Sequence, residues 1–187
     1  AMFANNMLLP FYLQQVLHFS PSKTGLLMMA FPTMMAIIAP LSGHASDRFG
    51  PMKLTTGGLL FMASSLFYFS TLSSTASAWR VLPGMILGGI GSGLFQSPNN
   101  SSVMSAVPIA KIGVAGAINS LVRNVGMIIG IAFSVTLFES YGGVSVPSAG
   151  QIQLFMSAYH KVMLAAMCIA LLATAISLGR KGYAKAD

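Results

Sequence analysis

Residues 43–50 read Gly-His-Ala-Ser-Asp-Arg-Phe-Gly, and they hold the only adjacent acid and base in the chain, Asp47 and Arg48. Apolar stretches flank this octapeptide at residues 24–43 and 54–72. Each stretch is long enough to cross a bilayer, because an α-helix rises about 1.5 Å per residue. A soluble helical domain would carry charges along one face of its helices. The pattern therefore predicts a tight hairpin that joins two membrane-spanning helices.

The composition is that of a membrane protein and not of a soluble domain. Of the 187 residues, 55% are hydrophobic and 7% are charged, and the mean hydropathy is +0.75. About a quarter of the residues of a soluble globular protein are charged. The formal net charge is +7, but the basic residues flank apolar runs and form no patch with interleaved aromatic residues. We expect the lipid bilayer, and no nucleic acid, as the partner.

Six apolar runs follow one another, separated by short segments rich in turn-forming residues. The first run is short and contains asparagine, glutamine and proline, so we interpret it as a truncated span. The chain also begins with alanine, which suggests a fragment. This pattern predicts an all-α, polytopic bundle of six transmembrane helices in one domain. The predicted spans cover residues 1–17, 24–43, 54–72, 81–107, 113–138 and 158–178, and a tail follows at 179–187.

The basic residues divide unevenly between the two ends of the predicted bundle. Cytoplasmic loops carry an excess of lysine and arginine, so we expect the octapeptide and the C-terminus to face the cytoplasm in a multi-pass protein of the cell membrane. The richer end has Arg48, Lys53, Lys111, Arg180, Lys181 and Lys185, and the other end has Lys23, Arg80 and Lys161.

The octapeptide resembles the loop signature of the major facilitator superfamily, in which glycine, aspartate, arginine and glycine occupy fixed positions. Three positions depart from the signature: Ala45 replaces the usual leucine, and Pro51 and Met52 replace the usual basic residues. Residues 12–17, the glycine-rich fourth run and residues 115–130 resemble the C-terminal six helices of fourteen-span drug:proton antiporters. The matching signature residues are Gly43, Asp47, Arg48 and Gly50.

This resemblance implies the C-terminal half of the major facilitator fold, with the N-terminal half of the transporter missing from this chain. It also implies proton-coupled efflux of small hydrophobic molecules by alternating access, with organic cations among the candidate substrates. The loop signature would act as a conformational latch on the cytoplasmic side. The glycine–proline step of the antiporters is absent at residues 126–130, so the direction of transport depends on the resemblance alone.

Several polar side chains are predicted inside the apolar runs, where a polar group needs a partner or water. Arg123 lies about ten residues, or about 15 Å, inside its run and shares a helix face with Asn119. Snorkelling of Arg123 to the interface and ordinary hydrogen bonds between helices are the alternatives. Transporters bind substrate near the midplane, so these residues are candidates for a cavity or gate: Gln14, Gln15, Gln96, Asn99, Asn100, Asn119 and Arg123, with Asn5 and Asn6.

Glycines recur at helical spacing in the fourth and fifth runs. Small residues at such positions let helix backbones approach closely in lipid, and no G-x-G-x-x-G phosphate-binding fingerprint is present. The 14 methionines and 12 phenylalanines are typical of packing and lipid-facing positions, or of an adaptable surface for lipophilic ligands. The predicted helix-packing residues are Gly84, Gly88, Gly89, Gly91, Gly93, Gly126 and Gly130.

The sequence contains no H-E-x-x-H, no G-x-S-x-G and no acidic pair on one helix face. We therefore expect no enzymatic activity, no catalytic residue, no cofactor and no metal site. The acids are Asp47, Glu139 and Asp187, and none is predicted at mid-depth, so the proton-coupling carboxylate is expected in the missing half. Two alternatives remain open: a polytopic structural or interaction subunit, including a self-associating half-transporter, and a carrier for a metabolite.

Overall fold

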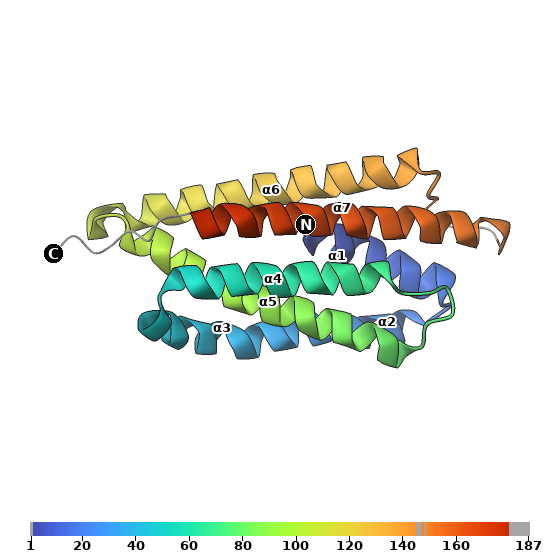
Figure 1. Cartoon of the computed structure of the whole chain (residues 1–187), viewed down its shortest axis with the longest axis horizontal. Coiled ribbons are helices and arrows are strands. Elements are labelled where there is room, and N and C mark those ends of the chain that lie inside the picture. Colours follow the sequence, from blue (N-terminus) through green and yellow to red (C-terminus); the bar gives the residue numbers. More distant parts are fainter. Residues whose placement is uncertain (1, 145–146, 148, 180–187) are drawn as a thin grey trace.

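The computed structural model describes residues 2–144, 147 and 149–179 (Figure 1). All regular elements in these residues are helices, which confirms the predicted all-α fold. Short 3-10 turns lie at Ile109–Lys111 and Ala149–Gln151. The longer helical elements are α1 (Met2–Phe11), a π-helical turn (Tyr12–Val16), α2 (Pro21–Met28), α3 (Ala30–Phe49), α4 (Pro51–Ser70), α5 (Ala78–Ser105), α6 (Ile112–Ser140) and α7 (Ile152–Gly179).

Helices α2 and α3 form one nearly continuous rod. Ser20 caps its start, because the Ser20 hydroxyl accepts a hydrogen bond from the backbone N–H of Lys23 at 3.3 Å. Met29 joins the two helices with right-handed helical dihedrals. Pro32 follows shortly after and has no N–H with which to bond the carbonyl of Met28. The interruption between α2 and α3 is therefore local and does not turn the chain.

The octapeptide forms the predicted hairpin between α3 and α4. Gly50 ends α3 with a φ of +83°, a left-handed conformation that glycine adopts without steric cost. Pro51 then begins α4 at a position where its missing N–H costs nothing. Asp47 and Arg48 lie in the last turn of α3. The partial negative charge of a helix C-terminus favours the arginine there and disfavours the carboxylate.

The long helices run lengthwise, so the loops gather at two ends (Figure 1). We call the end with the α3–α4 hairpin, the α5–α6 connection and the end of α7 the motif end, since it contains residues 43–50. The opposite end holds the connections after the π-helical turn, after α4 and after α6. Arg48, Lys53 and Lys111, which the sequence analysis assigned to the end richer in basic residues, thus lie at the motif end. Arg180, Lys181, Lys185 and the rest of the predicted tail lie outside the described residues.

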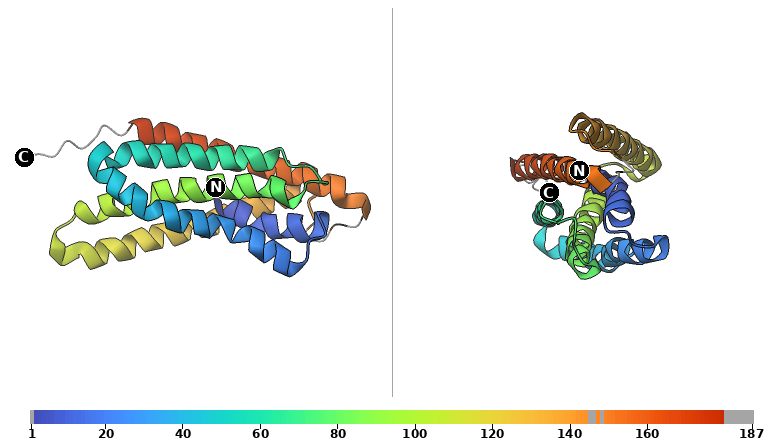
Figure 2. Two further views of the ribbon diagram at one scale, coloured as in Figure 1. Left: turned by 90° about the horizontal axis from the view of Figure 1, so that it is seen from below. Right: turned by 90° about the vertical axis from the view of Figure 1, so that its right-hand side faces the viewer.

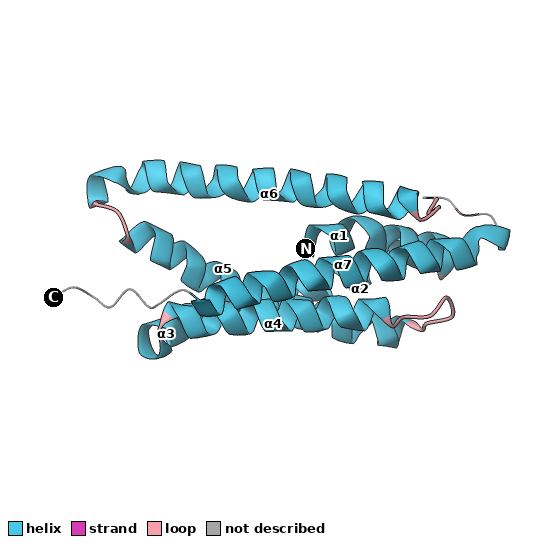
Figure 3. Ribbon diagram, turned by 45° about the horizontal axis from the view of Figure 1, so that its top comes forward, coloured by secondary structure: helices cyan, strands magenta, loops and turns pink. Residues whose placement is uncertain are grey.

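Helix α5 is central to the packing. It contacts α3 and α4, while α4 also packs on α7 and α1 packs on α6 and α7. Seen end on, α6 and the α2–α3 rod lie on opposite sides of the bundle (Figure 2). Figure 3 shows how short loops connect these helices.

The α5 glycines lie where neighbouring helices come closest. A Cβ added to Gly91 would lie 2.7 Å from the carbonyl oxygen of Gly58 on α4, and one added to Gly93 would lie 2.9 Å from Cβ of Ile38 on α3. Gly84, Gly88 and Gly89 are equally enclosed. By contrast, a Cβ on Gly126 or Gly130 would meet nothing within 4 Å in the described residues. The packing role of these two α6 glycines stays a prediction.

An aromatic cluster fills the core at the end opposite the motif end. The rings of Tyr12 and Tyr159 stack with centroids 5.2 Å apart, and Phe155 packs beside Tyr159. The Tyr12 hydroxyl donates to the carbonyl of Ser73 at 2.6 Å. Because a carbonyl can only accept, Nε2 of His160 donates to the carbonyl of Leu72 at 2.7 Å. These bonds tie the α4–α5 loop to the first and last helical segments.

The surface is that of a membrane protein. By length and composition, three stretches of the described residues can cross a membrane, Pro21–Phe49, Ile109–Ser140 and Ile152–Gly179. Helix α6 exposes apolar side chains along its length, among them Leu121 at 63% and Ile128 at 64% exposure. Each predicted span falls on a helical stretch, but that all six cross the bilayer stays a prediction.

Candidate functional site

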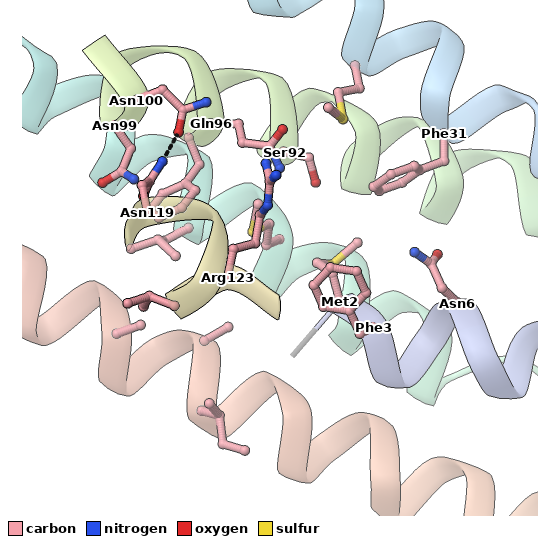
Figure 4. A pocket seen from close by; sticks show the side chains of 18 residues that line it. Met2, Phe3, Asn6, Phe31, Ser92, Gln96, Asn99, Asn100, Asn119 and Arg123 are labelled. Atoms are coloured by element: carbon pink, nitrogen blue, oxygen red, sulfur yellow. Dashed lines mark hydrogen bonds between the residues drawn. The ribbon is translucent and has the colours of Figure 1, made fainter. Parts of the chain in front are cut away.

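A cavity of about 560 Å³ lies among α1, α3, α4, α5, α6 and α7 (Figure 4). Its volume is within the range of small-molecule sites, about 300–1,000 Å³. Much of its wall is apolar, and most of its polar groups come from α5 and α6. The polar lining residues are Asn6, Ser92, Gln96, Asn99, Asn100, Asn119 and Arg123.

Helix α5 contributes the longest polar strip of the cavity. Gln96, Asn99 and Asn100 are spaced by three and four residues, so they share one helix face. Pro98 lies within this strip and is buried. Because proline has no N–H, the carbonyl of Leu94 loses its helical donor. The structure thus brings together the three α5 residues that the sequence singled out.

Helix α6 faces this strip with Asn119 and Arg123, one turn apart. Nδ2 of Asn119 donates to Oδ1 of Asn100 at 2.9 Å, which links α5 to α6 across the cavity (Figure 4). Arg123 lies 11 residues after Ile112, or about 17 Å along α6. Its side chain extends toward Ser92 and Gln96 of α5 (Figure 4). The cation is therefore directed into the cavity.

Arg123 has no counter-ion in the part of the chain that the structure describes. Neither Asp47 nor Glu139 lines the cavity, and no hydrogen bond to the guanidinium is formed by any described residue. The residue is exposed although it lines the cavity. The cavity is thus open on the α6 side and carries one permanent positive charge.

Of the candidate residues in the first helical segment, some line the cavity and others do not. Asn6 lines the cavity, whereas Gln14 and Gln15 lie half-buried on the π-helical turn and do not line it. Asn5 is fully buried, and its Oδ1 accepts from the Tyr159 hydroxyl at 3.5 Å. Nδ2 of Asn5 has no partner among the described residues. Asn5 thus belongs to the aromatic core and not to the cavity.

The hairpin is held to α5 by its small residues, while its charged residues point outward. The Ser42 hydroxyl donates to the carbonyl of Gly93 at 2.8 Å, and a Cβ on Gly43 would lie 3.1 Å from Oγ of Ser97. Asp47 and Arg48 are exposed and form no ion pair within the described residues. The structure therefore leaves both charges available to another segment, and their latch role stays a prediction.

The apolar half of the cavity was not identified residue by residue from the sequence. Helix α1 supplies Met2 and Phe3, and α3 supplies Phe31 and Met35. Ser92 could have been found, because it lies one turn before Gln96 on the same face. In the described residues, no group of three histidine, cysteine or acidic side chains could hold a metal ion.

Comparisons with known proteins agree with the octapeptide resemblance. A sequence profile of the Major Facilitator Superfamily matches residues 1–181. The riboflavin transporter RibZ of Clostridioides difficile is 36% identical over 135 residues, which is 72% of this chain. The multidrug resistance protein Stp of Mycobacterium tuberculosis is 36% identical over 65% of the chain. The tetracenomycin C resistance and export protein of Streptomyces glaucescens is 33% identical over 73% of the chain.

The chain matches only a part of each of these relatives. The aligned segments cover 30% of RibZ, 22% of Stp and 26% of the tetracenomycin C protein. All three relatives are named for transport or resistance and none for catalysis, which agrees with the expected absence of enzymatic activity. With the profile covering nearly the whole sequence, the chain belongs to the major facilitator superfamily, a family of transporters.

Proposed function

We propose that this chain is the C-terminal half of a secondary transporter that exports small, mainly apolar molecules by alternating access, coupled to protons. The observation that carries this proposal is the cavity between α5 and α6, in which Arg123, unpaired among the described residues, and a strip of amides face an apolar wall. Transporters commonly bind substrate near the midplane on interrupted helices. Pro98 interrupts the hydrogen bonding of α5 within the polar strip.

We infer a second half of the transporter from the partial alignment with the relatives and from the exposed apolar side chains of α6. The aligned segments cover 22% to 30% of the length of the relatives that the chain matches. The cavity is open on the side of α6, whose apolar side chains are exposed. A second six-helix half would cover part of this surface and close the cavity. We further propose that six spans cross the cell membrane with the motif end and the C-terminus in the cytoplasm.

The proton-coupling group lies outside the cavity described above. Among the described residues, the carboxylates are Asp47, at the motif end, and Glu139, near the opposite end of α6, and neither lines the cavity. A proton carrier must face water from each side in turn, so we place it in the other half. Asp47 and Arg48, which are exposed and unpaired in the described structure, would pair with that half in one conformation and separate in the other.

The test is transport by the full-length protein that carries this chain. Inverted membrane vesicles with an acidified lumen would be incubated with a panel of fluorescent lipophilic compounds in the external buffer, while the internal pH is followed with a separate dye. Substrate uptake that releases protons, and that stops when an uncoupler collapses the gradient, is the expected result. Gln96→Leu, in the cavity, should reduce uptake, whereas Gln153→Leu, which is exposed at the start of α7, should not. Vesicles that accumulate no member of the panel would refute the proposal.

A carrier for a metabolite is the second candidate, because the relative RibZ is named as a riboflavin transporter. Riboflavin therefore belongs in the panel. Uptake of riboflavin without any of the lipophilic compounds would favour this candidate. The intact mass of the endogenous product decides between either transporter and a self-associating half, since a mass near 19.6 kDa would require a second copy to complete the cavity.

A further inference from the structure

We propose that the cavity selects an apolar, ring-containing molecule whose polar end is an anion or a cluster of oxygen acceptors, and that Arg123 binds this end. The inference rests on the proposed transport function and names the substrate class of the same cavity. It departs from the organic cations among the sequence-based candidates, and four features of the cavity support it: its charge, its unpaired donors, its apolar wall and the depth of the guanidinium.

The charge of the cavity is positive. Arg123 is its only ionised lining residue in the described structure. A guanidinium keeps its charge at all physiological pH values and offers five N–H donors and no acceptor. A cationic ligand would lie beside a like charge that no carboxylate among the described lining residues offsets. Such repulsion discriminates against the wrong ligand. An anionic ligand would supply the counter-ion that Arg123 lacks.

Some of the polar side chains around Arg123 have no hydrogen-bond partner among the described residues. Asn119 and Asn100 bond to each other at 2.9 Å. The side chains of Ser92, Gln96 and Asn99 form no hydrogen bond with any described residue, and all three line the cavity. Their hydroxyl and amide N–H groups can donate to oxygen acceptors beside the guanidinium. A ligand with a carboxylate or neighbouring ring carbonyls would satisfy several of these donors at once.

The apolar wall opposite the polar strip is suited to the aromatic rings of a ligand. Phe3 of α1 and Phe31 of α3 line the cavity together with Met35 of α3 and Met62 of α4. Aromatic faces stack on flat ligands, and methionine side chains adapt to irregular outlines. A volume of about 560 Å³ accommodates a compound of several fused rings. The ligand is therefore amphiphilic, with rings against α1 and α3 and an acceptor end against α5 and α6.

The depth of Arg123 makes this arrangement specific. The residue lies about 17 Å from the start of α6, and its side chain points toward Ser92 and Gln96 (Figure 4). A cation at that depth is costly unless water or a partner satisfies it. A bound acceptor group relieves this cost, whereas a purely apolar ligand would remove water and leave the guanidinium unpaired. Ligands without acceptors should therefore bind more weakly than acceptor-bearing ligands of the same shape.

The test compares two dyes that share a fused three-ring xanthene body, anionic fluorescein and cationic rhodamine 123. Their binding to the purified full-length protein would be measured by fluorescence polarisation at neutral pH. We expect fluorescein to bind more tightly. Arg123→Gln should weaken fluorescein binding about 10- to 100-fold, the range for a hydrogen bond to a charged group, and leave rhodamine 123 unchanged or improved. Arg80→Gln, an equal loss of charge at the start of α5, should change neither.

Arg123→Lys tests whether the effect of Arg123→Gln comes from the lost charge and not from a disturbed fold. It keeps the positive charge but loses the planar fork, so it should weaken fluorescein less than Arg123→Gln does. Tighter binding of rhodamine 123 by the unaltered protein, or an equal loss of both dyes in Arg123→Gln, would overturn the inference. If vesicles transport cations or acceptor-free compounds only, the inference fails and the proposed function stands. If no compound is transported at all, the proposed function fails as well.

Discussion

Replacing Gly58 by alanine should force α4 and α5 apart. A Cβ on Gly58 would lie 2.7 Å from both the carbonyl oxygen of Gly91 and the backbone nitrogen of Phe95, and 3.1 Å from the carbonyl carbon of Leu94. Ordinary van der Waals contact begins at 3.4 Å, so the new methyl group is about 0.7 Å too close. All three atoms belong to backbone, which cannot turn away as a flexible side chain can.

The size of the effect follows from two opposing contributions. Overpacking a close contact costs about 1–3 kcal/mol. Alanine gains up to about 1 kcal/mol over glycine from its higher helix propensity. We therefore expect Gly58→Ala to lower the free energy of unfolding by up to about 2 kcal/mol. Gly91→Ala should act similarly, because its Cβ would lie 2.7 Å from the carbonyl oxygen of Gly58. The double variant should cost less than the sum, since one separation relieves both clashes.

Gly57 provides a matched control one residue away on the same helix. A Cβ on Gly57 meets nothing within 4 Å among the described residues, so Gly57→Ala should keep only the propensity gain. The apparent free energy of unfolding would be measured on the full-length protein in a mild detergent titrated with sodium dodecyl sulfate. Gly58→Ala should unfold at lower dodecyl sulfate than Gly57→Ala. Equal unfolding of the two variants would show that the α4–α5 contact is not as close as the structure has it.

Two further substitutions test single contacts with the same assay. Thr56→Val removes the 2.8 Å hydrogen bond between Thr56 and Ser177 that links α4 to α7, and it should cost about 0.6 kcal/mol, the average for such bonds between membrane helices. Thr55→Val is its control, since the Thr55 hydroxyl donates only to Met52 of its own helix, and an equal cost would contradict the interhelical role. Gly50→Ala should cost about 1–2 kcal/mol, because its φ of +83° is strained for any residue with a Cβ. No measurable cost would mean that the hairpin relaxes to another turn.

The helices could be predicted from the sequence because length and hydropathy alone identify long apolar runs. The hairpin could be predicted because Gly50 and Pro51 combine a left-handed end with a helix start. The π-helical turn at Tyr12–Val16 could not, since its residues have no composition that distinguishes it from an α-helix. Gln14 and Gln15 lie on this turn and do not line the cavity, although the sequence placed them with the other candidates.

From the sequence, only the polar residues that line the cavity could be identified. In water, a hydrophobic stripe marks the buried face of a helix, but in lipid both faces are apolar. Phe31 lines the cavity whereas Leu26, on the same rod, is 70% exposed, and hydropathy does not separate them. Arg123 and Asn119 stand out because polar residues are rare in such runs and share a face at a spacing of four. That these two meet the strip on α5 depends on how α5 and α6 cross, which no local pattern contains. The cavity residues that sequence reasoning can find are therefore its polar ones, while the residues of its apolar wall require the structure.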